Sequence, residues 1–291
     1  MPAITTPFNE DRTLDLGFFR HHVQRMLTVG CSGIVIGGSL GEAATLTFEE
    51  KQKLIATAIE ATNNTLPVVL GISALSTDEA VALVNMAELA GCAGLMVLPP
   101  YVYKGDWRET EYHFSKVIGQ TDLSCMLYNN PIAYGTDTLP EQVAELAQKH
   151  HNLLAIKESS ADVRRLSAIR HLIGDRLALF VGVDDIIVEG IAMGAVGWVA
   201  GLVNAFPEES VALFNLASEV GVEAALPLYQ WFLPLLQMDT VPKFVQLIKL
   251  VQQEVGLGSE RVRAPRLELT GTEREACLKS LKYALKNRIP K

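Results

Sequence analysis

Lys157 follows the apolar run 153–156 and is itself followed by Glu158-Ser159-Ser160. An ammonium at the end of a buried strand loses much of its hydration, which disfavours the charged form and lowers the pKa. The neutral amine is a nucleophile that can form a Schiff base with a carbonyl compound, an electron sink that needs no cofactor. A structural lysine that leaves the core to reach water would show the same pattern, so both interpretations stay open on this stretch alone.

Two further positions that could do chemistry stand at the ends of other apolar runs. The turn at 37–42, Gly-Gly-Ser-Leu-Gly-Glu, offers backbone N–H groups and the Ser39 hydroxyl, which suit a substrate carboxylate. Tyr128 can donate or accept a proton. Each also fits a structural role, as a tight turn or as a tyrosine at the core edge. Together with Lys157 they supply the amine, the proton shuttle and the anchor that a Schiff-base enzyme needs.

Two acidic residues next to these groups are predicted to have positioning roles. Glu42 is expected to cap or brace the helix after the turn rather than to act as a base. Glu158 is expected to orient the loop that follows Lys157.

The charge balance argues against a nucleic-acid partner. Lys and Arg total 25 against 33 Asp and Glu, a net charge of -8, and no stretch combines basic with aromatic residues. An acidic surface also repels small anions, so local donors must hold any carboxylate substrate. With 49% apolar and 20% charged residues, the composition is that of an ordinary globular protein with a large core.

Neither the cysteines nor the histidines form a metal-binding pattern. The cysteines, which are Cys31, Cys92, Cys125 and Cys277, lie far apart in the sequence. Most of them lie in or beside apolar runs, as free thiols do in proteins of a reducing compartment. No histidine stands at a predicted strand end, which argues against a metal-dependent aldolase. There is no signal-peptide pattern and no run of about 18 apolar residues, so we expect a cytoplasmic protein that does not bind membranes.

Short apolar runs alternate with amphipathic segments over the first two thirds of the chain. The apolar runs have little polar alternation, as strands do in a parallel sheet that is covered on both faces. The runs are Gly33–Ile36, Val68–Gly71, Leu95–Leu98, Cys125–Tyr128, Leu153–Lys157, Ala178–Val181 and Gly197–Ala200. We expect Pro2–Thr6 to form one more short strand. The helical segments include Phe48–Thr62, Thr77–Ala90, Pro140–Lys149 and Val163–Ile173. This order predicts an α/β fold, a (β/α)8 TIM barrel. A doubly wound open sheet is the alternative fold, but the sequence lacks the Gly-x-Gly-x-x-Gly motif that usually follows an early strand in that fold.

Beyond residue 204 the strand pattern gives way to long helical segments. These are Pro207–Glu219, Val222–Met238, Val241–Val255 and Thr272–Lys286. We therefore expect a barrel core over residues 1–204, through the last strand, and over 205–291 the last barrel helix and a C-terminal helical extension.

At this point the chain resembles the superfamily of dihydrodipicolinate synthase and N-acetylneuraminate lyase, class I aldolase-like barrels, over nearly its whole length. The motifs that carry the resemblance are Thr5-Thr6-Pro7-Phe8, Gly38-Ser39-Leu40-Gly41-Glu42, Leu98-Pro99-Pro100-Tyr101, Tyr128-Asn129-Asn130-Pro131 and Ile156-Lys157-Glu158-Ser159-Ser160. The resemblance implies that Lys157 forms an imine with a 2-oxo acid and that Tyr128 moves protons. It also implies that the turn at Gly38, Ser39 and Leu40 binds the carboxylate, that no cofactor or metal is needed, and that the protein is a homotetramer.

The chain departs from the synthase itself at several motif positions. Ser39 and Leu40 stand where the synthase usually has two threonines, so one hydroxyl of its proton relay is missing. Val102 stands in place of a tyrosine lent to the neighbouring subunit, and Ala133 in place of the arginine that binds a dicarboxylate. Tyr101 or Tyr103 is a possible substitute for the lost phenol, but nothing in the motif replaces the guanidinium. These departures argue against the synthase activity, which serves lysine biosynthesis.

Three segments are similar to the deaminases of hydroxyproline catabolism, which act on Δ1-pyrroline-4-hydroxy-2-carboxylate. They are the turn Gly38-Ser39-Leu40-Gly41-Glu42, the strand end Tyr128-Asn129-Asn130-Pro131 followed by Ala133-Tyr134-Gly135, and the segment Gly197-Trp198-Val199-Ala200-Gly201-Leu202-Val203-Asn204. That resemblance implies that Asn130 contacts the substrate hydroxyl and that Trp198 and Val199 form an apolar wall, although a core tryptophan is an equal alternative. A 2-keto-3-deoxy sugar acid aldolase or dehydratase is the second expectation, and the synthase the third. An alternative outside the enzymes is a barrel that has lost its activity and serves as a binding or scaffolding protein. The presence of Lys157, Tyr128 and Ser39 together argues against this alternative.

Overall fold

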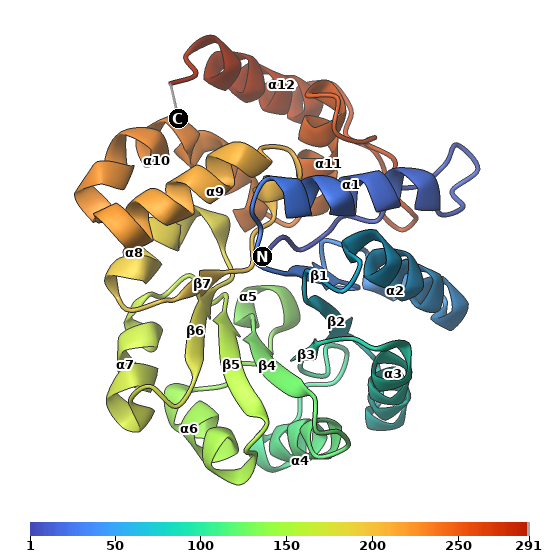
Figure 1. The fold of residues 1–291 in the computed structure, drawn as a ribbon, viewed down its shortest axis with the longest axis vertical. Helices are drawn as coiled ribbons and strands as arrows, with labels where there is room; N and C mark the ends of the chain where they lie inside the picture. The colour runs from blue at the N-terminus through green and yellow to red at the C-terminus, as the bar shows by residue number, and fades with distance from the viewer. Residues whose placement is uncertain (290–291) are drawn as a thin grey trace.

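The computed structural model describes residues 1–289, and its centre is a parallel sheet that curls around its own axis (Figure 1). Each strand pairs in parallel with the next one along the chain. The strands are β1 (Ile34–Ile36), β2 (Val68–Ile72), β3 (Gly94–Val97), β4 (Ser124–Asn129), β5 (Leu153–Glu158), β6 (Ala178–Val181) and β7 (Gly197–Trp198). All seven coincide with the apolar runs that predicted them, and nearly all their residues are buried because helices cover the outer face of the sheet.

The N-terminal segment joins the two edges of this sheet. Ala3 N–H donates to the Ala200 carbonyl at 2.8 Å, and Ile4 N–H donates to the Val35 carbonyl at 2.8 Å. The strand predicted over Pro2–Thr6 is thus present only as isolated bridges, to Ala200 after β7 and to Val35 in β1. The fold is an α/β fold of the TIM-barrel-like kind, and the alternative of a doubly wound open sheet is wrong because the strand order follows the sequence.

Helices surround the sheet, as Figure 1 shows. They are α1 (Leu16–Thr28), α2 (Phe48–Thr62), α3 (Thr77–Ala90), α4 (Trp107–Ile118), α5 (Pro131–Tyr134), α6 (Pro140–Lys149), α7 (Arg164–Ile173) and α8 (Ile187–Ala192). Local sequence sets their ends: Thr47 and Glu50 form a capping box at the start of α2, and Gly91 ends α3 with a φ of 84° that favours glycine. The helices predicted from amphipathic spacing are confirmed.

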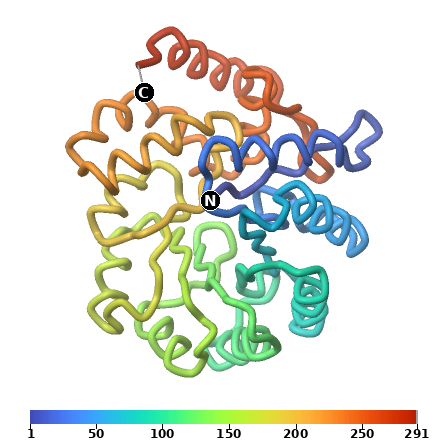
Figure 2. Tube along the Cα trace, in the orientation of Figure 1, coloured from blue at the N-terminus to red at the C-terminus, as the bar shows by residue number. Residues whose placement is uncertain are grey.

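The last part of the chain is helical, as predicted. It contains α9 (Pro207–Asn215), a π-helical turn over Leu216–Val220, α10 (Val222–Leu236), α11 (Phe244–Glu254) and α12 (Gly271–Lys286). Figure 2 shows these orange and red segments beside the blue N-terminal segment, and an ion pair between Arg12 and Glu268 at 2.8 Å joins the two. The last two residues of the predicted extension, 290 and 291, lie outside the described residues.

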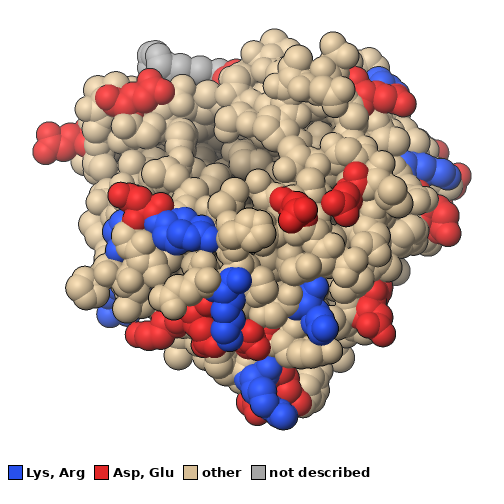
Figure 3. Space-filling model, turned by 60° about the horizontal axis from the view of Figure 1, so that its bottom comes forward, with Lys and Arg blue, Asp and Glu red and all other residues tan. Residues whose placement is uncertain are grey.

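Surface charges of both signs are intermixed on the face that Figure 3 shows, around a hollow whose rim is largely uncharged. Within the described residues no helix is long and apolar enough to cross a membrane. The same part of the chain contains no group of three His, Cys, Asp or Glu residues placed to hold a metal ion.

Candidate active site

Lys157 and Tyr128 lie side by side at the carboxyl ends of β5 and β4. The two residues are directly paired in the parallel register, so both side chains project from the same face of the sheet. Lys157 is 6% and Tyr128 4% exposed, and the Lys157 Nζ lies 4.1 Å from the centroid of the Tyr128 ring. Within the described residues this Nζ makes no hydrogen bond or ion pair. The strand pairing therefore brings together the two residues predicted for amine chemistry and proton transfer.

A glycine on the neighbouring strand end leaves room for the lysine. A Cβ placed on Gly182, just after β6, would lie 2.5 Å from the Lys157 Cε, closer than real Cβ contacts. The glycine thus allows the lysine stem to pass against the backbone of the adjacent strand.

Asn130 connects the Tyr128 hydroxyl to a short helix. Its Nδ2 donates to the Tyr128 hydroxyl at 3.0 Å, and its Oδ1 accepts from Ala133 N–H at 2.9 Å as the N-cap of α5. Pro131 occupies the first turn of that helix, which suits its missing N–H. Both polar groups of the predicted Asn130 are therefore engaged within the protein, and one of them holds the phenol.

Tyr134, at the end of α5, is a site residue that the sequence analysis missed. Its hydroxyl makes a short hydrogen bond to the Ser39 hydroxyl, and its ring packs edge-on against the Tyr128 ring with centroids 5.9 Å apart. Burial raises the pKa of Tyr134, so this phenol stays protonated. The signal in the sequence was the Asn-Pro helix start, since one helical turn beyond it returns the chain toward the strand end.

The two tyrosines expected as substitutes differ in their surroundings. The Tyr101 ring lies 5.8 Å from that of Tyr134, whereas the exposed Tyr103 donates its hydroxyl to Glu109 at 3.1 Å. Val102 between them is 75% exposed. Of these residues only Tyr101 is therefore part of the aromatic cluster beside the predicted site.

The turn at 37–42 lies at the carboxyl end of β1. Among the described residues the N–H groups of Ser39 and Leu40 have no hydrogen-bond acceptor, so they are open to a carboxylate oxygen. Two of its glycines have a structural reason: Gly37 has a φ of 66°, and a Cβ on Gly41 would lie 3.0 Å from the Ile4 carbonyl oxygen. Ser39 is half-buried, and Gly38 and Leu40 are buried.

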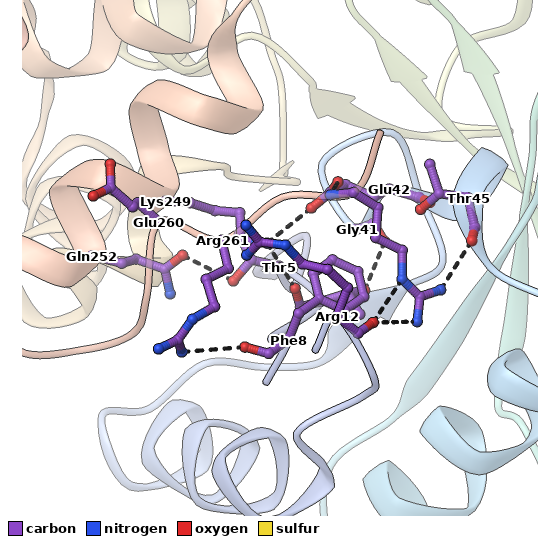
Figure 4. A network of polar contacts seen from close by, with 12 residues as sticks. Thr5, Phe8, Arg12, Gly41, Glu42, Thr45, Lys249, Gln252, Glu260 and Arg261 are labelled. Carbon is purple, nitrogen blue, oxygen red and sulfur yellow. Dashed lines mark hydrogen bonds and ion pairs between the residues drawn. The ribbon is translucent and has the colours of Figure 1, made fainter. Parts of the chain in front are cut away.

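Glu42 does not cap the helix after the turn, so that part of its prediction is wrong. It has a φ of 56° and no side-chain capping bond, and its carboxylate instead accepts from Lys249 Nζ at 2.8 Å and from Arg263 N–H at 3.0 Å. Lys249 also donates to the Thr6 carbonyl at 2.9 Å and lies over the Phe8 ring (Figure 4). The carboxylate thus ties the turn to α11, a contact between segments more than 200 residues apart that no local pattern could indicate.

Glu158 has the predicted orienting role. One of its carboxylate oxygens accepts from Ser160 N–H at 2.7 Å, and the other accepts from Asn129 Nδ2 at 3.0 Å. Burial raises the pKa of this carboxyl. The adjacent Ser159 hydroxyl is buried without a hydrogen-bond partner among the described residues.

Trp198 and Val199 are both buried at the end of β7, at 4% and 1% exposure. The Trp198 Nε1 donates to the Asp184 carboxylate at 3.0 Å, which gives the indole a role in the core rather than on an open wall. Asp184 and Asp239 both interact electrostatically with Lys157, and the sequence analysis missed both because neither belongs to a motif.

Comparison with known proteins adds independent information. The sequence profile of the dihydrodipicolinate synthetase family matches residues 1–284. A 4-hydroxy-tetrahydrodipicolinate synthase from Methanothrix thermoacetophila is 31% identical over 281 residues, 96% of this chain and 94% of the relative. The crystal structure of dihydrodipicolinate synthase from Thermotoga maritima superimposes with a TM-score of 0.92 at 26% identity, over 97% of each chain. A dihydrodipicolinate synthase variant described as monomeric gives a TM-score of 0.90 at 25% identity, over 98% of this chain and 94% of the variant.

Proposed function

Because the chain belongs to the dihydrodipicolinate synthetase family, whose members are Schiff-base-forming lyases, it is an enzyme of that kind, and we propose that it acts on a small hydroxylated 2-oxo or imino acid. The specific activity we propose is that of a Δ1-pyrroline-4-hydroxy-2-carboxylate deaminase. The observation that supports Schiff-base chemistry is the Lys157 Nζ at 4.1 Å from the centroid of the Tyr128 ring, which packs against Tyr134, the hydrogen-bond partner of Ser39.

The proposed roles follow from this arrangement. Lys157 attacks the ring imine carbon, and the Tyr128 phenol, held by Asn130, moves the proton between nitrogen and carbon. Ser39 supplies its hydroxyl, and the carboxylate binds the free N–H groups of the turn at Gly38 to Leu40. We assign Asn130 to the substrate hydroxyl, through water or after it turns, and Val199 to the apolar lining.

The proposed reaction has three stages. The lysine amine adds to the imine carbon, and ring opening leaves the substrate attached as a Schiff base. Loss of a proton from the adjacent carbon gives an enamine, from which water departs at the hydroxyl-bearing carbon. In the last stage protons shift from C5 and its nitrogen to C3 and C4, so that the C3–C4 double bond is lost and C5 becomes an imine carbon. Two waters then hydrolyse the C5 imine and the lysine imine, which gives ammonia and 2,5-dioxopentanoate and returns the free lysine.

A further candidate is 4-hydroxy-tetrahydrodipicolinate synthase, the activity for which the relatives are named. Arg266 favours it, because its positive charge acts on the Tyr134 phenol and could serve a second carboxylate. Against it stands Ala133, which is exposed on α5 and offers no guanidinium at the position where the resemblance expects one. A 2-keto-3-deoxy sugar acid aldolase or dehydratase would use the same lysine, tyrosine and serine.

Substrate assays with the purified protein separate these activities. Ammonia release from Δ1-pyrroline-4-hydroxy-2-carboxylate supports the deaminase, and pyruvate release from a 2-keto-3-deoxy sugar acid supports the aldolase. Condensation of pyruvate with aspartate semialdehyde supports the synthase. Borohydride reduction with each compound, followed by intact mass, tests the common step: the Lys157→Met variant should give no adduct. An adduct that persists in that variant would contradict the assignment of the nucleophile.

We further propose that the N-terminal segment acts as the eighth strand of a (β/α)8 barrel, with residues 205–291 as its last helix and extension. For the assembly we propose a homotetramer in the cytoplasm, with a small-molecule substrate and neither nucleic acid nor membrane as partner. Light scattering of the purified protein tests the assembly, and a mass of one subunit would contradict it.

A further inference from the structure

Two carboxyl groups lie next to each other at the mouth of the sheet, on the side of Lys157 away from the tyrosines. Asp184 follows β6 in the sequence, whereas Asp239 belongs to the 3₁₀ turn Gln237–Thr240 between α10 and α11. Asp184 N–H donates to the Asp239 Oδ2 at 3.3 Å. The C-terminal extension thus supplies a carboxyl group that reaches the end of β6.

Asp184 is fully buried and has its carboxylate saturated by donors. Its two oxygens accept from Trp198 Nε1 at 3.0 Å, from Gly201 N–H at 2.9 Å and from Leu202 N–H at 2.6 Å. Hydrogen bonds of this kind favour the ionised form. Asp184 therefore acts as a fixed anion that holds the backbone after β7 in place.

Asp239 has a different environment. Its Oδ2 accepts one hydrogen bond, and its Oδ1 has no hydrogen-bond partner among the described residues. This Oδ1 lies against the backbone after β7, because a Cβ on Gly201 would come within 2.6 Å of it. The residue as a whole is half-buried, on the short turn between α10 and α11.

The charges around this pair favour one shared proton. Lys157 from β5 is the basic group that acts on both carboxyls, and Asp184 and Asp185 are the acidic groups that act on Asp239. Burial raises the pKa of Asp184 to about 6, and burial together with the Asp184 charge raises that of Asp239 well above its usual range. Like charges this close do not both ionise readily, so the proton resides on the group with fewer donors, Asp239.

We propose that Asp239 is the acid that protonates the hydroxyl leaving the substrate, and that Asp184 positions it. The inference rests on the proposed function, in which water departs from an enamine attached to Lys157. In this step the enamine nitrogen pushes its electron pair to form the iminium, a carbon–carbon double bond forms, and the carbon–oxygen bond breaks. Asp239 gives its proton to the departing oxygen, so that water leaves and a carboxylate remains for the next solvent proton.

A pair of substrates that differ only in the leaving group tests the role of the acid. Δ1-Pyrroline-4-hydroxy-2-carboxylate needs a proton donor for its hydroxyl, whereas its 4-fluoro analogue expels fluoride with little help from an acid. For Asp239→Asn we expect kcat to fall by about 100-fold on the hydroxyl compound and by less than about threefold on the fluoro compound. Equal losses on the two substrates would show that Asp239 is not the acid.

The pH profile gives a second readout. For the wild type, kcat on the hydroxyl compound should decline as pH rises through the Asp239 pKa, since the acid loses its proton, and Asp239→Asn should lack this limb. Trapping of pyruvate by borohydride should be unchanged in the variant, because imine formation needs no leaving group. A trapping yield that falls together with kcat would indicate a merely structural role and contradict the proposal.

Asp122→Asn is the control, because it removes the same charge from an exposed carboxylate before β4 that has no part in this pair. It should keep the wild-type ratio of activities on the two substrates. Ammonia release by the wild type tests the proposed function by itself: failure there refutes that function, whereas equal losses in Asp239→Asn refute only the acid.

Discussion

At the scale of single residues, the proposed chemistry depends on hydroxyls that hydrogen bonds hold in place near the Lys157 amine. Tyr128 is held by Asn130, and Ser39 is held by Tyr134. This chain has Leu40 where the resemblance expects a second threonine hydroxyl, and the Tyr134 phenol contacts both the Ser39 hydroxyl and the Tyr128 ring. The proton relay that we propose therefore includes Tyr134, which the motifs do not imply.

Removing the Tyr134 hydroxyl should slow proton transfer. In Tyr134→Phe the ring keeps its packing but Ser39 loses its partner, so we expect kcat to fall by about 100-fold while the substrate KM changes little. Steady-state kinetics measure this. Tyr103→Phe is the control, because that phenol is exposed and bonded to Glu109, and it should have wild-type activity. A Tyr134→Phe enzyme as fast as the wild type would remove Tyr134 from the relay.

A methyl group at Gly182 should displace the nucleophile. The new Cβ of Gly182→Ala would lie 2.0 Å from the Ser159 hydroxyl oxygen and 2.5 Å from the Lys157 Cε, so both side chains must move. Because misplacement of a reacting group by about 1 Å can cost about 100-fold, we expect a loss of that order in the rate of imine trapping with pyruvate. Gly17→Ala is the control, since a Cβ there meets nothing closer than 3.6 Å. An unchanged trapping rate in Gly182→Ala would show that the lysine has room to spare.

At the scale of elements, the C-terminal helices hold the turn that is proposed to bind the substrate. Lys249 on α11 and Glu42 after the turn are 1% and 0% exposed and form a buried ion pair (Figure 4). Desolvation lowers the pKa of Lys249, and the Glu42 charge opposes this effect. Such a pair is weak evidence for net stability, but removal of one partner leaves a buried charge without compensation.

Lys249→Met should therefore destabilise the protein by about 3–5 kcal/mol, as breaking a buried ion pair generally does. Urea unfolding measures the change, and the double variant Glu42→Gln with Lys249→Met should recover part of it. The control is Lys243→Met, which breaks an exposed pair with Glu273 and should cost less than about 1 kcal/mol. A loss in Lys249→Met no larger than in Lys243→Met would contradict the role of the pair.

At the scale of the whole molecule, closure of the sheet depends on a buried polar cluster around Asn204. Asn204 Oδ1 accepts from the His22 Nε2 at 2.9 Å and from Thr5 N–H at 3.3 Å, and its Nδ2 donates to the Ala3 carbonyl at 2.8 Å. The cluster joins α1, the N-terminal segment and the turn after β7. Burial lowers the pKa of His22 to about 4, so the imidazole is neutral in the folded protein.

This histidine predicts how stability depends on pH. Between about pH 6.5 and 4 the unfolded chain binds a proton at His22 that the folded chain does not, so stability is lost as pH falls through this window, by roughly 3 kcal/mol. Urea unfolding at pH 7.5 and pH 4.5 measures the loss, and His22→Gln should show a smaller dependence. The neighbouring His21 is exposed, so His21→Gln should follow the wild type. If His22→Gln keeps the full wild-type dependence, the cause lies elsewhere.

The sequence by itself determined the strands, the order of the elements and the candidate residues at the strand ends. Short apolar runs without alternation, separated by amphipathic segments, are typical of buried parallel strands, and Lys157 and Tyr128 lie at the ends of such runs, so local pattern and motif position were sufficient. The helical nature of the last third followed from the same patterns. The extent of the barrel core over 1–204, the roles of Ser39, Leu40, Gly38, Asn130 and Val199, and the deaminase specificity stay predictions.

Only the tertiary structure decided which distant residues complete the site. Tyr134 reaches Ser39 across 95 positions, Glu42 meets Lys249 across 207, and Asp239 meets Asp184 across 55. None of these contacts has a periodic signature, because each depends on the closure of the sheet and on where the C-terminal helices pack against it. Pair contacts between segments far apart in the chain are set by packing, whereas the type of each element is set by its own residues.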